Sequence, residues 1–218
     1  MADTRITALT ELTSVDSADV LPIVDDPSGT PVTKKITQSN LLGSQKVVGT
    51  QDIWIPASAW WARTTNGAAS LATTETATNK VNYKTFDFDT STQEFIQCIW
   101  QPPRNWDNST VKFTPYWTAA SGSGGVVWAL QGVALSDDDA LDTAFGTEQT
   151  STDTLITAAD VHKGPQSSAI TIAGTPADGD LIVLQFKRNP SDGSDTLGVD
   201  AKFLGLMLEI SIDSGKST

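Results

Sequence analysis

Apolar and polar residues alternate along much of this chain with a period of two, the pattern of half-buried β-strands. In the clearest run, Val111 to Trp117, odd positions are apolar and even positions are polar. The run Val126 to Leu135 is apolar on both faces, so we expect a central strand that is covered on both sides. Ser121 to Gly125, which separates them, is rich in glycine, a residue that adopts positive φ without a Cβ clash. We therefore predict that the two strands form a hairpin.

The alternation stops after this pair of strands. Ser136 precedes Asp139, Ala140 and Leu141, and a serine followed by acidic residues within one turn is typical of a helix N-terminus. We predict one short helix that extends to Phe145.

The remaining predicted strands are short and closely spaced. Breaks such as Pro102-Pro103 and Asn189 to Gly193 separate them. These strands are Asp52–Ala57, Val81–Phe88, Phe95–Trp100, Thr152–Thr157, Ala169–Ala173, Asp180–Arg188 and Val199–Ile212. Roughly eight to ten strands with little helix are typical of a two-sheet sandwich. The predicted fold is all-β, a jelly-roll-like antiparallel β-sandwich with one short helix, and other Greek-key connections stay open.

Residues 1–45 differ from the rest because they contain no tryptophan and no long strand. A segment of this size buries too little apolar surface to be stable alone. We interpret it as a small extended arm that docks on another protein or on a second copy of the chain. Its predicted elements are the strands Val20–Val24 and Pro31–Ile36, the turn Asp26–Gly29, and a short helix from Thr37, as N-cap, to Leu42.

Composition narrows the possible functions. The chain has 218 residues, of which 39% are hydrophobic, enough for one domain of ordinary size and an extension. A net charge of -12 with only 14 lysines and arginines argues against nucleic-acid and acidic-membrane partners. The first residues lack a signal pattern, and no apolar run approaches the roughly 20 residues of a membrane span. We expect a soluble protein, made in the cytoplasm, that does not insert into membranes.

The sequence shows no motif for catalysis or cofactor binding. The lone cysteine, Cys98, lies in an apolar strand, where a thiol usually fills core space. The single histidine, His162, lies in a polar segment and is interpreted as a surface residue. No G-x-S-x-G elbow is present, and Gly122-Ser123-Gly124 leads into a strand instead of the helix of a dinucleotide loop. We expect a protein that is not an enzyme and binds no cofactor.

Two acidic runs could ligate a hard cation such as calcium. They are Asp137 to Asp139, and Asn189 with Asp192 and Asp195. Neither has the spacing, with a distal glutamate, of a complete calcium loop. The interpretation that we favour is carboxylates in solvated turns, without a metal.

Seven tryptophans are numerous for this length, and aromatic rings serve cores, interfaces and sugar binding alike. Trp60 and Trp61 are adjacent, so only one of them can enter the same core. The other would contact a neighbouring subunit or a glycan, or would lie partly exposed at the surface. Trp106, in a predicted loop, is the single residue that we expect to contact a ligand. Strand alternation places the following tryptophans in the core: Trp54, Trp100, Trp117 and Trp128.

Two parts of the sequence resemble bacteriophage proteins. The N-terminal segment of many tailed-bacteriophage fibre and appendage proteins is similar to I-T-A-L-T-E-L from Ile6, D-V-L-P-I-V-D-D from Asp19 and T-K-K-I-T-Q-S-N-L-L-G from Thr33. A family of phage-encoded proteins of unassigned role resembles R-T-T-N-G-A-A-S at Arg63, T-N-K-V-N-Y-K-T-F-D-F at Thr78 and the stretch Trp117 to Phe145. Together the two resemblances cover most of the chain.

The resemblance implies a virion component that is assembled in the host bacterial cytoplasm. It implies an arm that attaches to a capsid, neck or tail protein and a projecting β-domain, commonly a trimer, and it carries over no active site. The arm residues that we expect to make the attachment are Asp19, Val20, Leu21, Ile23, Val24, Lys34, Lys35, Ile36, Leu41 and Leu42.

We therefore predict an attachment arm at 1–45, a linker at 46–51, a β-sandwich at 52–213 and a flexible tail at 214–218. The predicted function is a non-enzymatic, homotrimeric head or neck fibre or decoration protein of a tailed-phage particle. One alternative is a tail-fibre receptor-binding module that contacts host polysaccharide through Trp106, with Trp60 or Trp61 as further contacts. Another is a capsid-stabilising cement protein.

Overall fold

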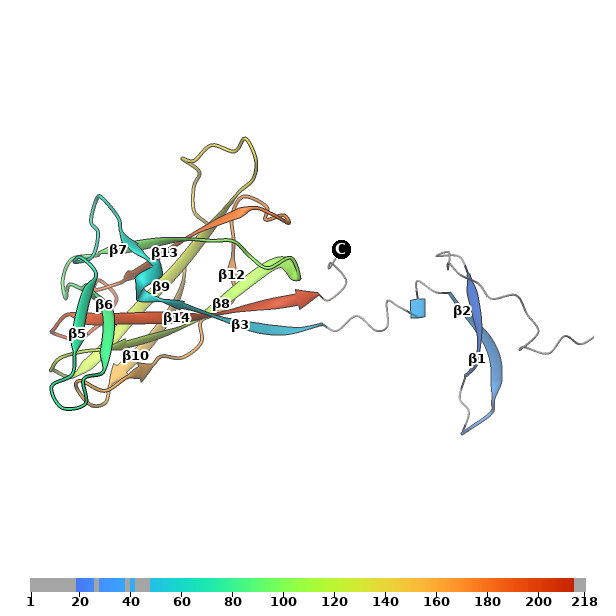
Figure 1. Cartoon of the computed structure of the whole chain (residues 1–218), viewed down its shortest axis with the longest axis horizontal. Helices are drawn as coiled ribbons and strands as arrows, with labels where there is room; N and C mark the ends of the chain where they lie inside the picture. The colour runs from blue at the N-terminus through green and yellow to red at the C-terminus, as the bar shows by residue number, and fades with distance from the viewer. Residues whose placement is uncertain (1–18, 26–27, 38–39, 42–47, 214–218) are drawn as a thin grey trace, which may run out of the picture. The chain divides into compact units, whose positions relative to one another are not determined.

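The computed structural model describes residues 19–25, 28–37, 40–41 and 48–213 (Figure 1). The chain divides into two compact units, Met1–Val47 and Val48–Thr218, which we describe separately. Several predicted features lie outside the described residues: the motif from Ile6, the first half of the turn at Asp26, Leu42, residues 46–47 of the linker and the tail 214–218.

In the first unit, β1 (Val20–Asp25) pairs with β2 (Val32–Thr37) in an antiparallel hairpin. The register runs from Val20 opposite Thr37 to Asp25 opposite Val32, which confirms the two strands expected from the sequence. The Thr37 hydroxyl accepts a hydrogen bond from the backbone N–H of Asn40 at 3.3 Å, the geometry expected of the proposed N-cap.

The second unit is an all-β sandwich of two antiparallel sheets, as predicted (Figure 1). The five-stranded sheet has the order β10-β9-β13-β7-β4. Its strands are β4 (Trp61–Ala62), β7 (Phe95–Trp100), β9 (Gly124–Leu135), β10 (Gln149–Leu155) and β13 (Leu181–Arg188).

The seven-stranded sheet has the order β11-β8-β14-β6-β5, with β12 added on β8 and β3 added on β14. In Figure 1, β14 crosses the unit beside β3 and β8, and it pairs with both along most of its length. The strands are β3 (Val48–Pro56), β5 (Ala72–Glu75), β6 (Asn82–Phe88), β8 (Trp106–Thr118), β11 (His162–Lys163), β12 (Ile170–Thr171) and β14 (Ala201–Asp213), and the 3-10 helix η2 (Ala57–Ala59) follows β3. Because β3 begins at Val48, residues 48–51 are strand and not the predicted linker.

The predicted hairpin between Val111–Trp117 and Val126–Leu135 is wrong, because β8 and β9 belong to different sheets. The glycine-rich stretch between them carries the chain from one sheet to the other, with Gly122 at φ 94° and Gly124 at φ 122°. The predicted coverage of β9 is confirmed, since most of its residues are buried on both faces. Its neighbours are β10 and β13.

The predicted helix from Ser136 to Phe145 is also wrong, because this segment is a turn followed by an irregular loop. The backbone N–H of Ser136 donates to the Asp139 carboxylate at 2.8 Å, and Asp138 has a φ of 66°. A positive φ at Asp138 is incompatible with a right-handed helix, and the Asp139 N–H donates to the Ser136 carbonyl at 3.2 Å. The same residues therefore close a turn at the end of β9.

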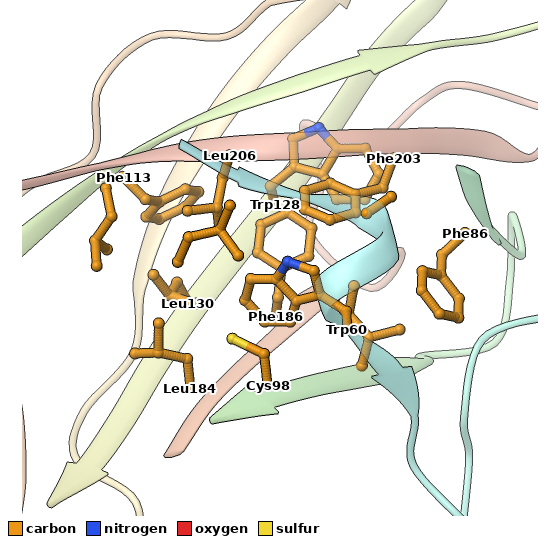
Figure 2. Close-up of a cluster of buried hydrophobic side chains, with 14 of the residues drawn as sticks. Trp60, Phe86, Cys98, Phe113, Trp128, Leu130, Leu184, Phe186, Phe203 and Leu206 are labelled. Atoms are coloured by element: carbon orange, nitrogen blue, oxygen red, sulfur yellow. The ribbon is translucent and has the colours of Figure 1, made fainter. Parts of the chain in front are cut away.

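The core between the sheets is a cluster of buried hydrophobic side chains with aromatic rings among them (Figure 2). Phe186 on β13 lies 4.5 Å from Phe203 on β14, measured between ring centroids, so the two sheets meet there. Trp128 stacks on Phe186 at 5.2 Å with an interplanar angle of 21°. Cys98 is part of this cluster, and burial raises the pKa of its thiol to about 12, which confirms its interpretation as core filler.

Candidate binding groove

The structure corrects two of the tryptophan predictions. Trp106 is fully buried, because β8 begins five residues before the strand expected from the sequence and its ring lies 5.6 Å from Trp100. Local polar bonds, such as that from Ser109 N–H to the Asp107 carboxylate, make this part of the strand resemble a loop in the sequence. Trp106 therefore cannot be the predicted ligand contact.

Trp54, predicted to be core, is 46% exposed on the outer face of β3, because its neighbour Ile55 takes the inward position. The prediction for the adjacent pair is confirmed: Trp60 is buried and Trp61 is 46% exposed. The other tryptophans predicted to be core are buried: Trp100, Trp117 and Trp128.

A groove lies on the outer face of the seven-stranded sheet, with a volume of about 420 Å³. It combines carboxylate, ammonium, amide and apolar side chains. Its lining residues are Asp52, Thr114, Lys163, Gly164, Pro165, Gln166, Met207 and Glu209.

The floor of the groove follows from the strand register of β3, β14 and β8. Trp54, Met207 and Thr114 form one row across the three strands. Asp52, Glu209 and Lys112 form a parallel row two residues further along β14, and the Lys112 ammonium lies 3.3 Å from the Glu209 carboxylate. Alternation along each strand directs both rows to the same outer face.

The wall of the groove is the segment from Lys163 to Gln166, which several hydrogen bonds hold in place. Lys163 is the last residue of β11 and lies opposite Tyr116 of β8. The backbone N–H of Gly164 donates to the Pro115 carbonyl at 2.9 Å. The Ser151 hydroxyl donates to the Pro165 carbonyl at 2.6 Å. The wall is therefore anchored on both sides of Gly164.

An aromatic pair borders the groove. Trp54 meets Tyr116 edge to face, with ring centroids 5.1 Å apart and an interplanar angle of 90°. The indole of Trp54 lies against Gly205, where an added Cβ would stand 2.6 Å from the ring, and the φ of 152° at Gly205 also disfavours a side chain. Gly205 thus leaves the space in which the exposed indole is fixed.

His162, interpreted as a surface residue, is buried on β11 at 6% exposure. Its ring lies 4.9 Å from the Trp117 ring, and its Nε2 atom is 3.0 Å from the Thr157 carbonyl. The indole N–H of Trp117 donates to the Asp153 carboxylate at 2.9 Å. Pairing of β11 with β8 places the histidine over this indole, a long-range contact that the polar local sequence did not indicate.

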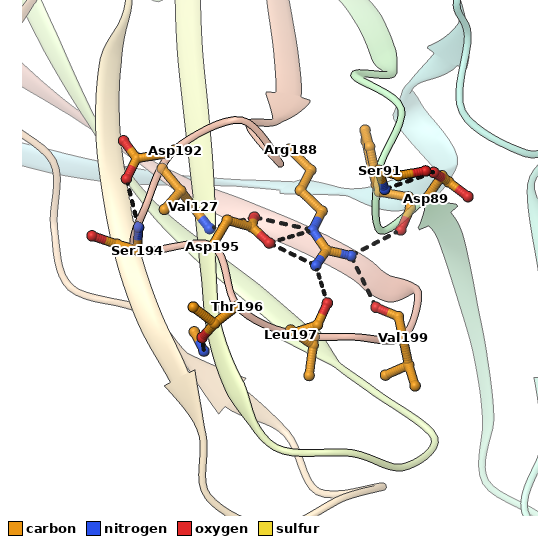
Figure 3. Close-up of polar contacts among 12 residues, drawn as sticks. Asp89, Ser91, Val127, Arg188, Asp192, Ser194, Asp195, Thr196, Leu197 and Val199 are labelled. Carbon is orange, nitrogen blue, oxygen red and sulfur yellow. Dashed lines mark hydrogen bonds and ion pairs between the residues drawn. The ribbon is translucent and has the colours of Figure 1, made fainter.

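Asp195, from the second acidic run, forms a buried ion pair with Arg188 (Figure 3). Arg188 and Asp195 are 0% and 1% exposed, with 2.7 Å between guanidinium and carboxylate. The Arg188 guanidinium also donates to the backbone carbonyls of Val199 and Leu197. Asp195 accepts from the Val127 N–H, and Asp192 from the Ser194 N–H. The described residues contain no group of three or more His, Cys, Asp or Glu side chains that could hold a metal ion.

The predicted arm residues are mostly exposed in the β1–β2 hairpin. Val20 is 49%, Leu21 50% and Ile23 39% exposed. Lys34 and Lys35 are exposed too, whereas Asp19, Ile36 and Leu41 are partly exposed.

No helix in the described parts of the chain is long and apolar enough to cross a membrane. No protein-family model and no curated protein matches the sequence.

Solved structures give low-identity matches. A family 22 carbohydrate-binding module of Clostridium thermocellum Xyn10B is 11% identical over 76% of this chain and 94% of its own, with a TM-score of 0.42. The carbohydrate-binding module TmCBM61, solved with β-1,4-galactotriose, is 12% identical over 73% of this chain and 86% of its own, with a TM-score of 0.33. An infectious bursal disease virus structure is 12% identical over 92% of this chain and 38% of its own, with a TM-score of 0.31. Because these TM-scores are below 0.5, the matches carry no functional argument.

Proposed function

We propose that this protein is a non-enzymatic structural component of a tailed-phage particle. Its N-terminal unit attaches it to a capsid, neck or tail protein, and its β-sandwich projects as a homotrimeric head or neck fibre or decoration. The observation that carries the proposal is the apolar surface of the β1–β2 hairpin.

This hairpin cannot bury its apolar residues by itself. Val20, Leu21, Ile23 and Val32 are each 39% to 50% exposed, although all four belong to paired strands. An isolated two-stranded hairpin is at best marginally stable in water, and exposed apolar patches mark contact surfaces. A partner surface that covers these side chains would stabilise the hairpin and attach the chain.

Three residues of types that are used in nucleophilic chemistry have structural contacts. The thiol of Cys98 is buried with a pKa raised to about 12, so it is not a thiolate at neutral pH. His162 is held against Trp117, and Asp153 accepts the Trp117 N–H. These contacts support a structural role for all three residues.

The attachment can be tested on particles that lack this protein. We expect the purified full chain to bind such particles and the double variant Leu21→Ser/Ile23→Ser to lose binding at least about tenfold, since two apolar side chains would no longer be buried at the contact. The matched control is Leu181→Ser, which replaces a leucine of similar exposure, 45%, on the sandwich. Equal binding by the double variant would refute the proposed attachment surface.

One further measurement distinguishes the possible positions on the particle: electron microscopy of particles labelled with an antibody against residues 48–213. Label on the head or neck supports a fibre or decoration protein. Label at the distal tail supports the receptor-binding alternative, for which Trp106 is unavailable because it is buried. Unlabelled particles would contradict the virion proposal.

A further inference from the structure

An aromatic ring in a fixed orientation lies beside the groove of the seven-stranded sheet, since Trp54 is the β3 partner of the lining residue Met207. Trp54 is 46% exposed, yet its position is set by Gly205 beneath it and by the edge-to-face contact with Tyr116. A rigid, half-exposed indole offers an apolar face at a low cost in conformational entropy. The C–H face of a pyranose ring is a suitable partner for such a surface.

Polar side chains line the same groove. Within the part of the chain that the structure describes, the side chains of Asp52 and Gln166 form no hydrogen bonds. A carboxylate accepts hydrogen bonds, an ammonium such as that of Lys163 donates them, and an amide does both. This mixture matches hydroxyl groups, which also donate and accept.

The charges at the groove offset one another. Asp52 and Glu209 face Lys112 and Lys163, two carboxylates and two ammonium groups, while the chain as a whole carries -12. A local balance of this kind offers no net attraction to a charged ligand, and the overall negative charge disfavours an acidic one. The volume of about 420 Å³ is within the usual range of small-ligand sites.

From this combination we propose that the groove binds an uncharged oligosaccharide. One sugar ring stacks on Trp54, and its hydroxyls bond to Asp52, Lys163, Gln166 and Glu209. The proposal does not depend on attachment to a particle, because the groove is built entirely from strands and loops of the sandwich.

The test is a titration of the purified full chain with cello-, xylo-, manno- and malto-oligosaccharides, followed by calorimetry and tryptophan fluorescence. We expect millimolar or tighter binding of at least one of them, with a change in tryptophan emission that is lost in Trp54→Ala. Trp54→Ala should weaken this binding at least about tenfold, and Gln166→Ala by about fivefold. Gln166 lies in an exposed loop, so its variant remains informative if Trp54→Ala folds poorly.

Trp61→Ala is the matched control, since Trp61 is also 46% exposed but lies on β4 of the other sheet. This variant should bind as the unaltered chain does. Loss of binding in Trp61→Ala with retention in Trp54→Ala and Gln166→Ala would overturn the assigned site. Absence of binding to all four oligosaccharides, or preference for an acidic oligogalacturonate, would overturn the proposed ligand class. The Leu21→Ser/Ile23→Ser variant should bind sugar normally, which separates this test from that of the attachment.

Discussion

The two units of this protein differ in how far the apolar side chains of their strands are buried. In β14, Leu206, Leu208 and Ile210 are completely buried between the two sheets. In β1, Leu21 and Ile23 are 50% and 39% exposed, although the strand is also apolar and pairs with β2 along its whole length. Strand pairing satisfies backbone hydrogen bonds, but apolar side chains are buried only when a second layer faces them. The sandwich contains that layer, whereas for the hairpin the second layer is the partner surface that we propose.

The largest expected effect comes from disrupting the sandwich at its buried ion pair. Arg188→Met leaves the Asp195 carboxylate buried without its guanidinium, and removal of one partner from such a pair costs about 3–5 kcal/mol. Urea denaturation should therefore show a large fall in the free energy of unfolding.

The control for this prediction is the double variant Arg188→Met/Asp195→Leu. It removes both charges and should recover part of the loss, because no isolated charge stays in the interior. The Val127 N–H would still lose its acceptor, so recovery should be incomplete. If the double variant were no more stable than Arg188→Met, the buried charge would not be the cause.

A smaller effect is expected in the loop that joins β6 to β7 of the sandwich. Asp89 accepts hydrogen bonds from the backbone N–H groups of Ser91 and Thr92, both at 2.7 Å, and these bonds lower its carboxyl pKa to about 2. Because the folded pKa is below the unfolded value, the stabilisation is complete above about pH 4 and is lost as the pH falls towards about 2. Asp89→Asn should cost about 0.5–1 kcal/mol at pH 7, a modest value because the carboxylate is close to solvent.

The difference in unfolding free energy between Asp89→Asn and the unaltered chain should shrink below about pH 4. The pKa of the neighbouring Glu94 carboxyl is shifted in the opposite direction, because burial raises it. Glu94 also accepts a hydrogen bond from the Asp89 N–H. NMR titration of the Asp89 carboxyl measures its pKa directly. A value near the ordinary one for aspartate would contradict the proposed role of the two backbone bonds.

The positions of the strands could be predicted from the sequence better than the pairing between them. The alternation of β8 and β14 and the double-sided burial of β9 could be predicted because they depend on local side-chain periodicity. The prediction of a hairpin between β8 and β9 was wrong, because strand pairing depends on contacts that are distant in the sequence. The strand beside β8 is β14, where β9 was predicted.

The groove on the seven-stranded sheet was not predicted, for the same reason. Asp52, Glu209 and Lys112 are far apart in the sequence and become neighbours only through the register of β3, β14 and β8. Trp54 could have been predicted to face outward, since Ile53 and Ile55 occupy the alternate positions of its strand. The burial of Trp106 could not have been predicted, because polar residues with local side-chain bonds follow it in β8.

The smallest expected effect is that of hairpin substitutions on the stability of the sandwich. Leu21→Ser/Ile23→Ser should change the sandwich's free energy of unfolding by less than about 0.5 kcal/mol, because these side chains are already exposed and belong to the other unit. Ile99→Ser, at a residue 55% exposed on the sandwich itself, provides the matched control and should also have little effect. A loss above about 2 kcal/mol in the hairpin variant would show that these side chains are buried within the chain in solution. The hairpin would then need no external partner, and the difference between the two units would disappear.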